Sequence, residues 1–257
     1  MNMLRRADIL GFPILDETAA RVATVVCDEL RRGPPKSFVF LNPHSIVVAD
    51  QDSPLRTAIV DAYGIFCDGV GLALAGLMLN RRRIIRVYGY EFFTALSREL
   101  SARGTGRIFF LGGSQDSLAE LIAKYRTEFP GISSIDSYAP PFKSEFRAEE
   151  IKDMADRISA SGADILWVGL GSPKQEKILH RLMQLCDLSC GAAIGAVFDF
   201  YTGRIPHAPA WIRKAGLQWA HRLVLEPKRL WKRTLVSTPL FLWLVLRKLF
   251  RPMGPSR

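Results

Sequence analysis

The sequence predicts an α/β fold: a Rossmann-like, mostly parallel sheet with helices on both faces, followed by a C-terminal helical appendage. Up to about residue 203, short apolar runs rich in β-branched and aromatic residues alternate with longer amphipathic runs. This alternation is typical of parallel sheets, because each strand is reached through a crossover helix. With 257 residues, 48% of them hydrophobic, the chain is long enough to bury the core of such a sheet.

The individual elements follow from the same pattern. Apolar runs that end in glycine or a polar residue predict buried strands at 37–42, 107–113, 164–171 and 190–200. Amphipathic runs predict helices at 114–129, 147–161 and 173–185. Ser114 is a favourable N-cap for the first of these helices, and Pro173 suits the first turn of the last.

Charge divides the chain into two parts, which we expect to be an α/β catalytic domain at 1–203 and a basic, tryptophan-rich helical appendage at 204–257. The formal net charge of +10 comes wholly from the appendage, where 12 Lys/Arg stand against a single acid, Glu226. Residues 1–203 are nearly neutral, with 23 Lys/Arg and 24 Asp/Glu. Such asymmetry predicts a polyanionic partner, either an anionic membrane surface or a nucleic acid.

The apolar segment 234–250 predicts contact between the appendage and a membrane. Pro239 interrupts its apolar core, which is shorter than the roughly 20 residues that a spanning helix needs. Flanking Lys and Arg, with Trp231 and Trp243, are typical of a helix lying in the membrane interface. The alternative is a helix packed on the domain. The first residues lack the apolar core of a signal peptide, so we expect a cytoplasmic protein, peripheral on the inner face of the plasma membrane. A homo-oligomer is compatible with the sequence.

The sequence predicts no metal site and no cofactor. The four cysteines lack metal-ligand spacing and predict reduced, buried thiols, and the four histidines show no zinc-binding spacing. Asp50 and Asp52 have the DxD spacing with which many glycosyltransferases hold a metal-bound nucleotide. Because Ser53 and Pro54 follow it, Asp52 is expected instead to be a turn or cap residue.

Asp68 is the first candidate for a catalytic group. It ends the apolar run 65–67 and is followed by Gly69 and Gly71, which leave room for a substrate. A carboxylate at a strand end, partly withdrawn from water, has a raised pKa suited to accepting a proton. The alternative is a helix N-cap, which a strand-to-helix turn also favours. Arg86, inside an apolar run, is expected to point inward toward an anion.

Two glycine-containing loops predict phosphate contacts. The first, 110–117, holds Gly112 and Gly113, and the second, 168–176, holds Gly169, Gly171 and Lys174. Backbone N–H groups at a helix start bind anions, and glycine allows a phosphate to approach closely. The alternative is that these glycines serve tight packing of strand on helix. Neither loop matches the dinucleotide fingerprint or the P-loop, which disfavours a nicotinamide-dependent oxidoreductase.

Nine blocks of sequence, in this order, resemble the WecG/TagA/CpsF family of bacterial glycosyltransferases. The blocks are LNP (41–43), CDGVG (67–71), RVYGYEF (86–92), FFLGG (109–113), FPG (129–131), ADILWVGLGSPKQE (163–176), GAVFDFYTG (195–203), APAWIRKAGLQWAHRL (208–223) and EPKRLWKR (226–233). The resemblance implies inverting, metal-independent transfer of a hexose or N-acetylhexosamine-type sugar from a UDP-sugar to a polyprenyl-diphosphate-linked saccharide. This reaction belongs to exopolysaccharide or other cell-envelope polysaccharide biosynthesis at the cytoplasmic membrane.

The resemblance also implies roles for single residues. Asp68 would be the general base, Arg86 would act near the donor, and Gln175 would touch the sugar or the diphosphate. Cations of the appendage would neutralise the leaving group or the acceptor diphosphate; they are Arg222, Arg229, Lys232 and Arg233. The remaining candidates for substrate binding are Asn42, Gly69, Gly112, Gly113, Gly169, Gly171, Lys174 and Asp199.

The sequence departs from the family pattern near the expected site. Phe40 stands where a threonine is frequent, and His44 stands where an acid usually follows the LNP block. The donor therefore stays open between a neutral hexose and an N-acetylmannosamine-type sugar. The alternative function is that of a nucleic-acid-binding α/β protein, which rests on charge and aromatic residues alone, and we expect no nucleic-acid partner.

Overall fold

An eight-stranded sheet organises the protein in the computed structural model, which describes residues 4–206, 208–209, 211–212, 217–225, 231 and 235–250. The strand order is β1-β2-β4-β3-β8-β7-β5-β6. β1 runs antiparallel to β2, and the other neighbouring pairs are parallel. The strands are β1 (Arg6–Ile9), β2 (Phe12–Leu15), β3 (Lys36–Leu41), β4 (Gly64–Cys67), β5 (Arg107–Gly112), β6 (Ser134–Tyr138), β7 (Ile165–Gly169) and β8 (Cys190–Ala193). The predicted α/β class with a mostly parallel sheet is confirmed.

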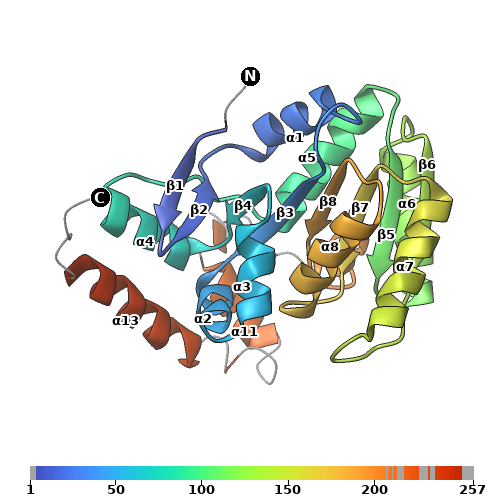
Figure 1. The fold of residues 1–257 in the computed structure, drawn as a ribbon. Helices are drawn as coiled ribbons and strands as arrows, with labels where there is room; N and C mark the ends of the chain where they lie inside the picture. The colour runs from blue at the N-terminus through green and yellow to red at the C-terminus, as the bar shows by residue number, and fades with distance from the viewer. Residues whose placement is uncertain are drawn as a thin grey trace.

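Helices cover both faces of this sheet, as the strand–helix alternation predicts. Residues of α2, α3, α4, α7, α8 and α13 join the core on one face, and residues of α1, α5, α6 and α9 join the core on the other. Figure 1 shows α3 and α8 in front of the sheet and α13 at its left edge. The helices are α1 (Ala19–Asp28), α2 (Pro43–Gln51), α3 (Ser53–Val60), α4 (Val70–Asn80), α5 (Gly89–Ala102), α6 (Gln115–Glu128), α7 (Ala148–Ser161), α8 (Lys174–Leu185), α9 (Val197–Thr202), α11 (Gln218–Leu225) and α13 (Ser237–Phe250).

Alternating side chains of the buried strands supply the two cores. In β3, Phe38 and Phe40 enter one core while Val39 and Leu41 enter the other, as the two-residue period of a strand requires. Phe40 stacks on Phe66 with ring centroids 5.2 Å apart. The aromatic ring at position 40 is therefore part of the core, which accounts for a large apolar residue at this place.

The strand expected over 190–200 is wrong in its second half. β8 ends at Ala193, and α9 begins at Val197 after a turn in which Gly195 has a φ of 62°. The apolar run continues across the turn because Val197, Phe198 and Tyr201 bury one side of a helix rather than of a strand. A continuous apolar run does not by itself separate a buried strand from a buried helix.

α13 packs on the domain against α2 and α4 through a narrow stripe. Its buried residues are Ser237, Phe241 and Val245, spaced four apart on one face of the helix. The Oγ of Ser237 lies 2.8 Å from Nδ1 of His44 in α2. No helix in the described part of the chain has both the length and the apolarity to cross a bilayer.

Candidate active site

The carboxyl ends of the parallel strands bring most of the predicted residues to one edge of the sheet. Asn42 follows β3, Asp68 follows β4, Gly113 follows β5, and Gly171 lies two residues after β7. In α/β sheets, ligands bind at this edge because the loops that follow the strands meet there. β3 and β4 are neighbours, and the N–H of Asp68 donates to the carbonyl of Leu41 across 2.8 Å. Asp68 and Asn42 are thus held side by side.

Asp68 stands between buried Cys67 and the start of α4. The N-cap position of α4 belongs to Gly69, whose φ is 99°, and not to Asp68, which precedes it. Asp68 is therefore not the N-cap residue of this helix. A Cβ added to Gly69 would meet no atom within 4 Å, whereas one added to Gly71 would lie 2.7 Å from Pro43. Room beside the carboxylate comes from Gly69, and Gly71 serves packing.

A short segment carrying Arg86 lies alongside the end of β4. Cys67 and Arg86 pair as an isolated parallel β-bridge, and the N–H of Val87 donates to the carbonyl of Cys67 across 3.0 Å. Nη1 of Arg86 donates to the hydroxyl of Tyr88 across 3.3 Å. The chain therefore places Arg86 and Tyr88 next to the strand end that carries Asp68, although 18 residues separate Asp68 from Arg86.

Electrostatics show that these groups act on one another. Burial, reinforced by the charge of Asp68 and opposed by that of Arg86, raises the pKa of the Cys67 thiol to about 12. Burial likewise raises the pKa of Tyr88, and here too Arg86 lowers it while Asp68 raises it. A carboxylate and a guanidinium thus share one half-buried corner with a phenol. Tyr88 was not among the predicted residues, and its place inside the RVYGYEF block is the signal that could have identified it.

Asn42 and Gln175 each hold the backbone of the site. Oδ1 of Asn42 accepts from the N–H of Ser45 across 3.1 Å and so caps α2. Gln175 is buried, with only 5% of its surface exposed. Its Oε1 accepts from the N–H of Gly171 across 3.1 Å, and its Nε2 donates to Glu176 and to the carbonyl of Ala193. Gln175 therefore ties the loop after β7 to the end of β8, and its contact with a substrate stays a prediction.

The predicted glycines fall into two classes. A Cβ on Gly112 would lie 2.4 Å from the carbonyl oxygen of Gly169, one on Gly113 would lie 2.6 Å from Oγ of Ser117, and one on Gly169 would lie 2.6 Å from the Phe198 ring. These three glycines are required by packing within the protein. Gly171, with a φ of 81°, meets nothing within 4 Å and is open to a ligand.

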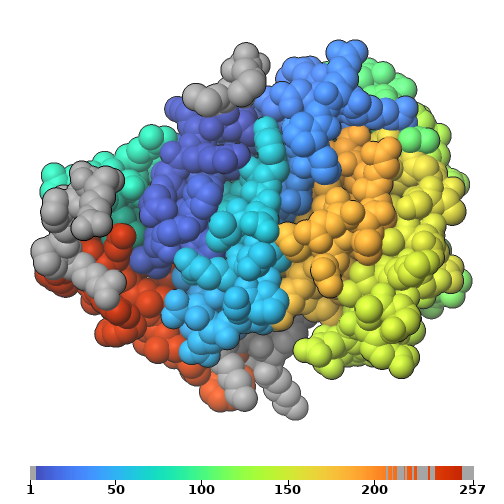
Figure 2. Space-filling view, in the orientation of Figure 1, coloured from blue at the N-terminus to red at the C-terminus, as the bar shows by residue number. Residues whose placement is uncertain are grey.

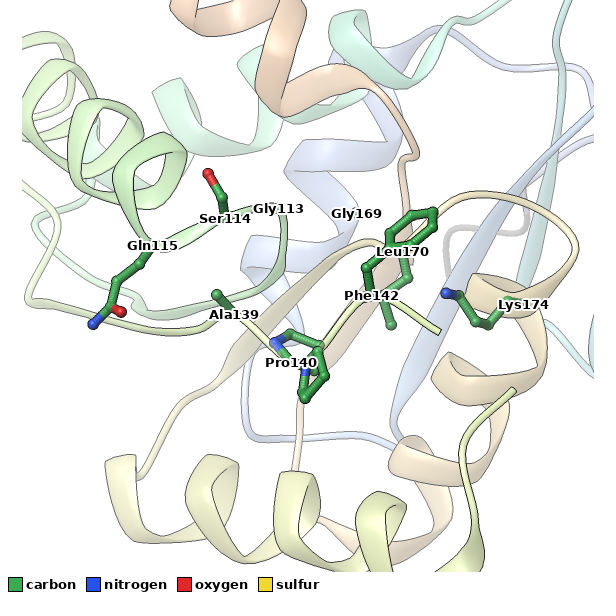
Figure 3. Close-up of a pocket in the computed structure, with 10 residues that line it drawn as sticks. Gly113, Ser114, Gln115, Ala139, Pro140, Phe142, Gly169, Leu170 and Lys174 are labelled. Atoms are coloured by element: carbon green, nitrogen blue, oxygen red, sulfur yellow. The ribbon is translucent and has the colours of Figure 1, made fainter. Parts of the chain in front are cut away.

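A pocket of about 510 Å³ opens where β5, β6 and β7 end. It is lined by Gly113, Ser114, Gln115, Ala139, Pro140, Pro141, Phe142, Gly169, Leu170 and Lys174. Ser114 caps α6, as predicted, and accepts from the N–H of Ser117 across 3.2 Å. Figure 3 shows Lys174 and Phe142 toward one end of the pocket and Ser114 and Gln115 toward the other.

Lys174 provides the pocket with a cation. Burial lowers the pKa of its ammonium group, which donates to the carbonyl of Lys143. The ammonium also lies 5.4 Å from the ring centroid of Phe142 and 5.1 Å from that of Phe146. Lys174 therefore lies beside two aromatic rings at the start of α8, where its charge and the N-terminus of the helix would attract an anion.

The remaining predicted residues have other outcomes. Asp199 lies half-exposed in the first turn of α9, after β8. Arg222 lies in α11, and its side chain, like Arg229, Lys232 and Arg233, lies outside the described residues. Asp52 caps α3 by accepting from the N–H of Leu55 across 2.9 Å and pairs with Lys177 across 2.5 Å. Within the described ranges, no three His, Cys, Asp or Glu side chains are grouped so that they could hold a metal ion.

All four cysteines are buried and free, as their scattered spacing predicts.

One more residue, Asp16, supports the site and was not predicted. Asp16, buried after β2, accepts from the N–H of Ile85 across 3.0 Å and pairs with Arg82. Its place directly after the apolar run 12–15 parallels that of Asp68 and is the signal that could have identified it.

Comparison with known proteins identifies the class of this site. A model described as "Glycosyl transferase WecG/TagA/CpsF family" matches residues 7–254. An N-acetylglucosaminyldiphosphoundecaprenol N-acetyl-beta-D-mannosaminyltransferase of Bacillus spizizenii (strain ATCC 23059 / NRRL B-14472 / W23) is 30% identical over 210 residues, which cover 82% of this chain and 78% of that protein. A protein of the same name from Bacillus subtilis (strain 168) is 29% identical over 208 residues, covering 81% and 78%. The chain therefore belongs to the WecG/TagA/CpsF family and is a glycosyltransferase.

Proposed function

We propose that this glycosyltransferase moves a sugar from a UDP-sugar to a polyprenyl-diphosphate-linked saccharide, with inversion at the anomeric carbon. One observation carries the proposal: the Asp68 carboxylate, with the Arg86 guanidinium nearby, and a pocket share the carboxyl edge of the sheet. From β4, which precedes Asp68, to β7, which borders the pocket, the sheet order counts three steps. At about 4.8 Å per step this is about 14 Å, a span that a nucleoside diphosphate sugar can bridge.

In this arrangement the pocket receives the nucleotide diphosphate. The capped start of α6 offers backbone N–H groups, and Lys174 offers a cation at the other side. The open position at Gly171 lies on the path from the pocket toward β4, with Gln175 holding its backbone. The donor sugar would lie along this path, with its anomeric carbon toward Asp68.

The chemical step needs a base at the acceptor hydroxyl and positive charge near the diphosphate that leaves. Asp68 accepts the proton of the acceptor hydroxyl, whose oxygen forms the new bond to the anomeric carbon. The bond from that carbon to the UDP oxygen breaks, and its electron pair leaves with UDP. Arg86 and the appendage cations Arg222, Arg229, Lys232 and Arg233 stabilise the growing charge, as a metal does in other enzymes. The transfer is therefore expected to be metal-independent.

The relatives suggest the first substrates to test. Both names state transfer of an N-acetylmannosaminyl group to N-acetylglucosaminyldiphosphoundecaprenol. Because this acceptor is a membrane lipid, we place the reaction at the inner face of the plasma membrane. The exposed apolar side of α13 and its terminal Arg247 and Lys248 would lie against the anionic bilayer. Family membership favours this reading over the nucleic-acid alternative.

The decisive experiment measures UDP release from a panel of UDP-sugars with a synthetic acceptor, an N-acetylglucosamine diphosphate lipid. Asp68→Asn should lower kcat by about 10²- to 10⁴-fold, the usual contribution of a general base. The variant should unfold at the wild-type temperature, and Asp187→Asn, an exposed carboxylate after α8, should keep full activity. Full activity of Asp68→Asn would refute the base assignment. Loss of activity on addition of EDTA would refute metal independence.

A further inference from the structure

α4 carries an apolar surface that the domain does not bury. Leu72, Ala75 and Gly76 face the core, whereas Leu74, Leu77 and Met78 are 53%, 42% and 45% exposed. The exposed residues are spaced three and four apart, so they form one stripe on the outer side of the helix. α4 contains no charged residue at all. A helix that is apolar on every side is normally buried in protein or in a membrane.

A second exposed apolar face lies on α13, which is next to α4. It packs against α4 and α2, and its buried residues leave the outward face free. That face exposes Leu242, Trp243, Leu246, Leu249 and Phe250. Figures 1 and 2 show α13 along the left edge of the molecule, with α4 above it. Exposed apolar side chains from two adjacent helices exceed the scattered residues normal for a protein surface.

Positive charge borders the surface at the end of each helix. Arg81 and Arg83, on either side of the Arg82 that pairs with Asp16, follow α4 and are exposed, and Arg247 and Lys248 lie in the last turn of α13. The guanidinium of Arg247 lies 5.2 Å from the ring centroid of Trp243. Neither helix contains an acidic residue. Two copies of this surface facing each other would bring like charges together, whereas an anionic bilayer would complement both its apolar and its basic parts.

We propose that α4 is a second membrane-binding helix, and that α4 and α13 together form the surface by which the enzyme meets the bilayer. The proposal rests on the proposed function, because it concerns how a lipid-linked acceptor reaches Asp68. α4 starts two residues after Asp68, and Leu74 lies about 6 Å along the helix from its first residue, Val70. Val70 and Gly71, one turn before Leu74, are half-buried, so the exposed stripe ends before it reaches Asp68. The base is thereby held close to the bilayer but outside it, where the diphosphate-linked sugar rather than the lipid chain would lie.

The triple variant Leu74→Ser/Leu77→Ser/Met78→Ser tests the role of α4. Its binding to vesicles of phosphatidylglycerol and phosphatidylcholine should weaken about tenfold or more, because each apolar group withdrawn from the bilayer lowers the partition constant. Transfer to a long-chain acceptor in the same vesicles should fall in parallel. Transfer to a short-chain, water-soluble acceptor, and the unfolding temperature, should stay at wild-type values. Leu185→Ser is the matched control, because Leu185 is 58% exposed at the end of α8.

Three results would overturn the proposal or separate it from the function on which it rests. If the triple variant bound vesicles as tightly as the wild type, α4 would not contact the membrane and α13 would be the membrane contact. If sedimentation without lipid showed a dimer for the wild type and a monomer for the triple variant, the face would be a protein interface and not a membrane-binding surface. Absence of transfer to either acceptor in the wild type would refute the proposed function, while vesicle binding would still report on α4.

Discussion

The carboxylate of Asp16 accepts a hydrogen bond from the backbone N–H of Ile85 across 3.0 Å, joining positions 69 residues apart. Asp16 is buried and also pairs with the guanidinium of Arg82. Ile85 immediately precedes Arg86, so the bond fixes the segment that lies beside the end of β4. Asp16 is thus a positioning residue for the site, acting through the backbone.

Asp16→Ala should lower both stability and activity. It leaves the N–H of Ile85 without its acceptor, which costs about 1–3 kcal/mol of the free energy of unfolding for a buried group. Asp16→Asn keeps an acceptor oxygen for Ile85 and should retain more of kcat, even though it loses the charge opposite Arg82. Urea unfolding and steady-state kinetics on both variants check this. Equal losses of kcat in the two variants would show that the bond to Ile85 does not position Arg86.

Gly171→Ala should reduce activity beyond its effect on stability. The φ of 81° disfavours any side chain by about 1–2 kcal/mol, although nothing in the protein lies within 4 Å of the new Cβ. Gly104→Ala, with a φ of 63° and equally open space, carries a similar strain in the loop before the amino end of β5, away from the carboxyl edge of the sheet. If the donor passes Gly171, only Gly171→Ala raises KM for the UDP-sugar. Unchanged kinetics in both variants would show that the space at Gly171 is not used.

Gly169→Ala should act on folding first. Its Cβ would lie 2.6 Å from Cε2 of Phe198, a ring buried in the core, and 3.2 Å from the carbonyl oxygen of Gly195. Forcing a methyl group into a packed core costs about 1–3 kcal/mol. The expected result is a lower unfolding temperature, measured by circular dichroism. A variant of wild-type stability that has lost transfer activity would instead assign Gly169 to the substrate.

The contact between His44 and Ser237 should contribute measurably to the docking of α13. Removing either partner in His44→Ala or Ser237→Ala should weaken docking by about 1 kcal/mol, the net value of one hydrogen bond. A double-mutant cycle should show a coupling of this size, and amide exchange in 237–250 should speed up equally in both single variants. Additive effects would mean that the 2.8 Å contact does not hold the helix.

Asp164 should make stability depend on pH in the acid range. Burial acts to raise its pKa, but hydrogen bonds from Arg31 and Arg107 outweigh burial and hold the pKa below its usual 3.8. A carboxyl group with a depressed folded-state pKa stabilises the fold above its unfolded-state pKa, and this contribution is lost as pH falls through the folded-state value. Wild-type protein should therefore lose stability from about pH 4 downward more steeply than Asp164→Asn. Parallel urea-unfolding curves across this range would contradict the assignment.

Strand–helix alternation and residue type were sufficient to predict the sheet, three long helices and the caps at Ser114 and Asp52. They could not separate β8 from α9, because the apolar run continues from β8 into Val197 and Phe198 and only the backbone turn at Gly195 divides the two elements. In the site, position after a strand identified Asp68. Tyr88 and Asp16 required the pairing of Cys67 with Arg86 and the bond to Ile85, which join residues distant in sequence. The exposed apolar surface on α4 could not be predicted, because exposure depends on neighbouring elements that the sequence pattern alone does not place.

The strand order also separates the protein into two halves that are encoded one after the other. Strands β1 to β4 occupy one side of the sheet and β5 to β8 the other, and the halves meet where β3 pairs with β8. The first half carries Asp68, Arg86 and α4, and the second carries the pocket with Lys174. Residues that would select a donor can therefore change without altering those that would receive an acceptor. A chimera that exchanges residues 107–185 between two relatives would therefore take its donor specificity from one parent and keep Asp68 and Arg86 from the other.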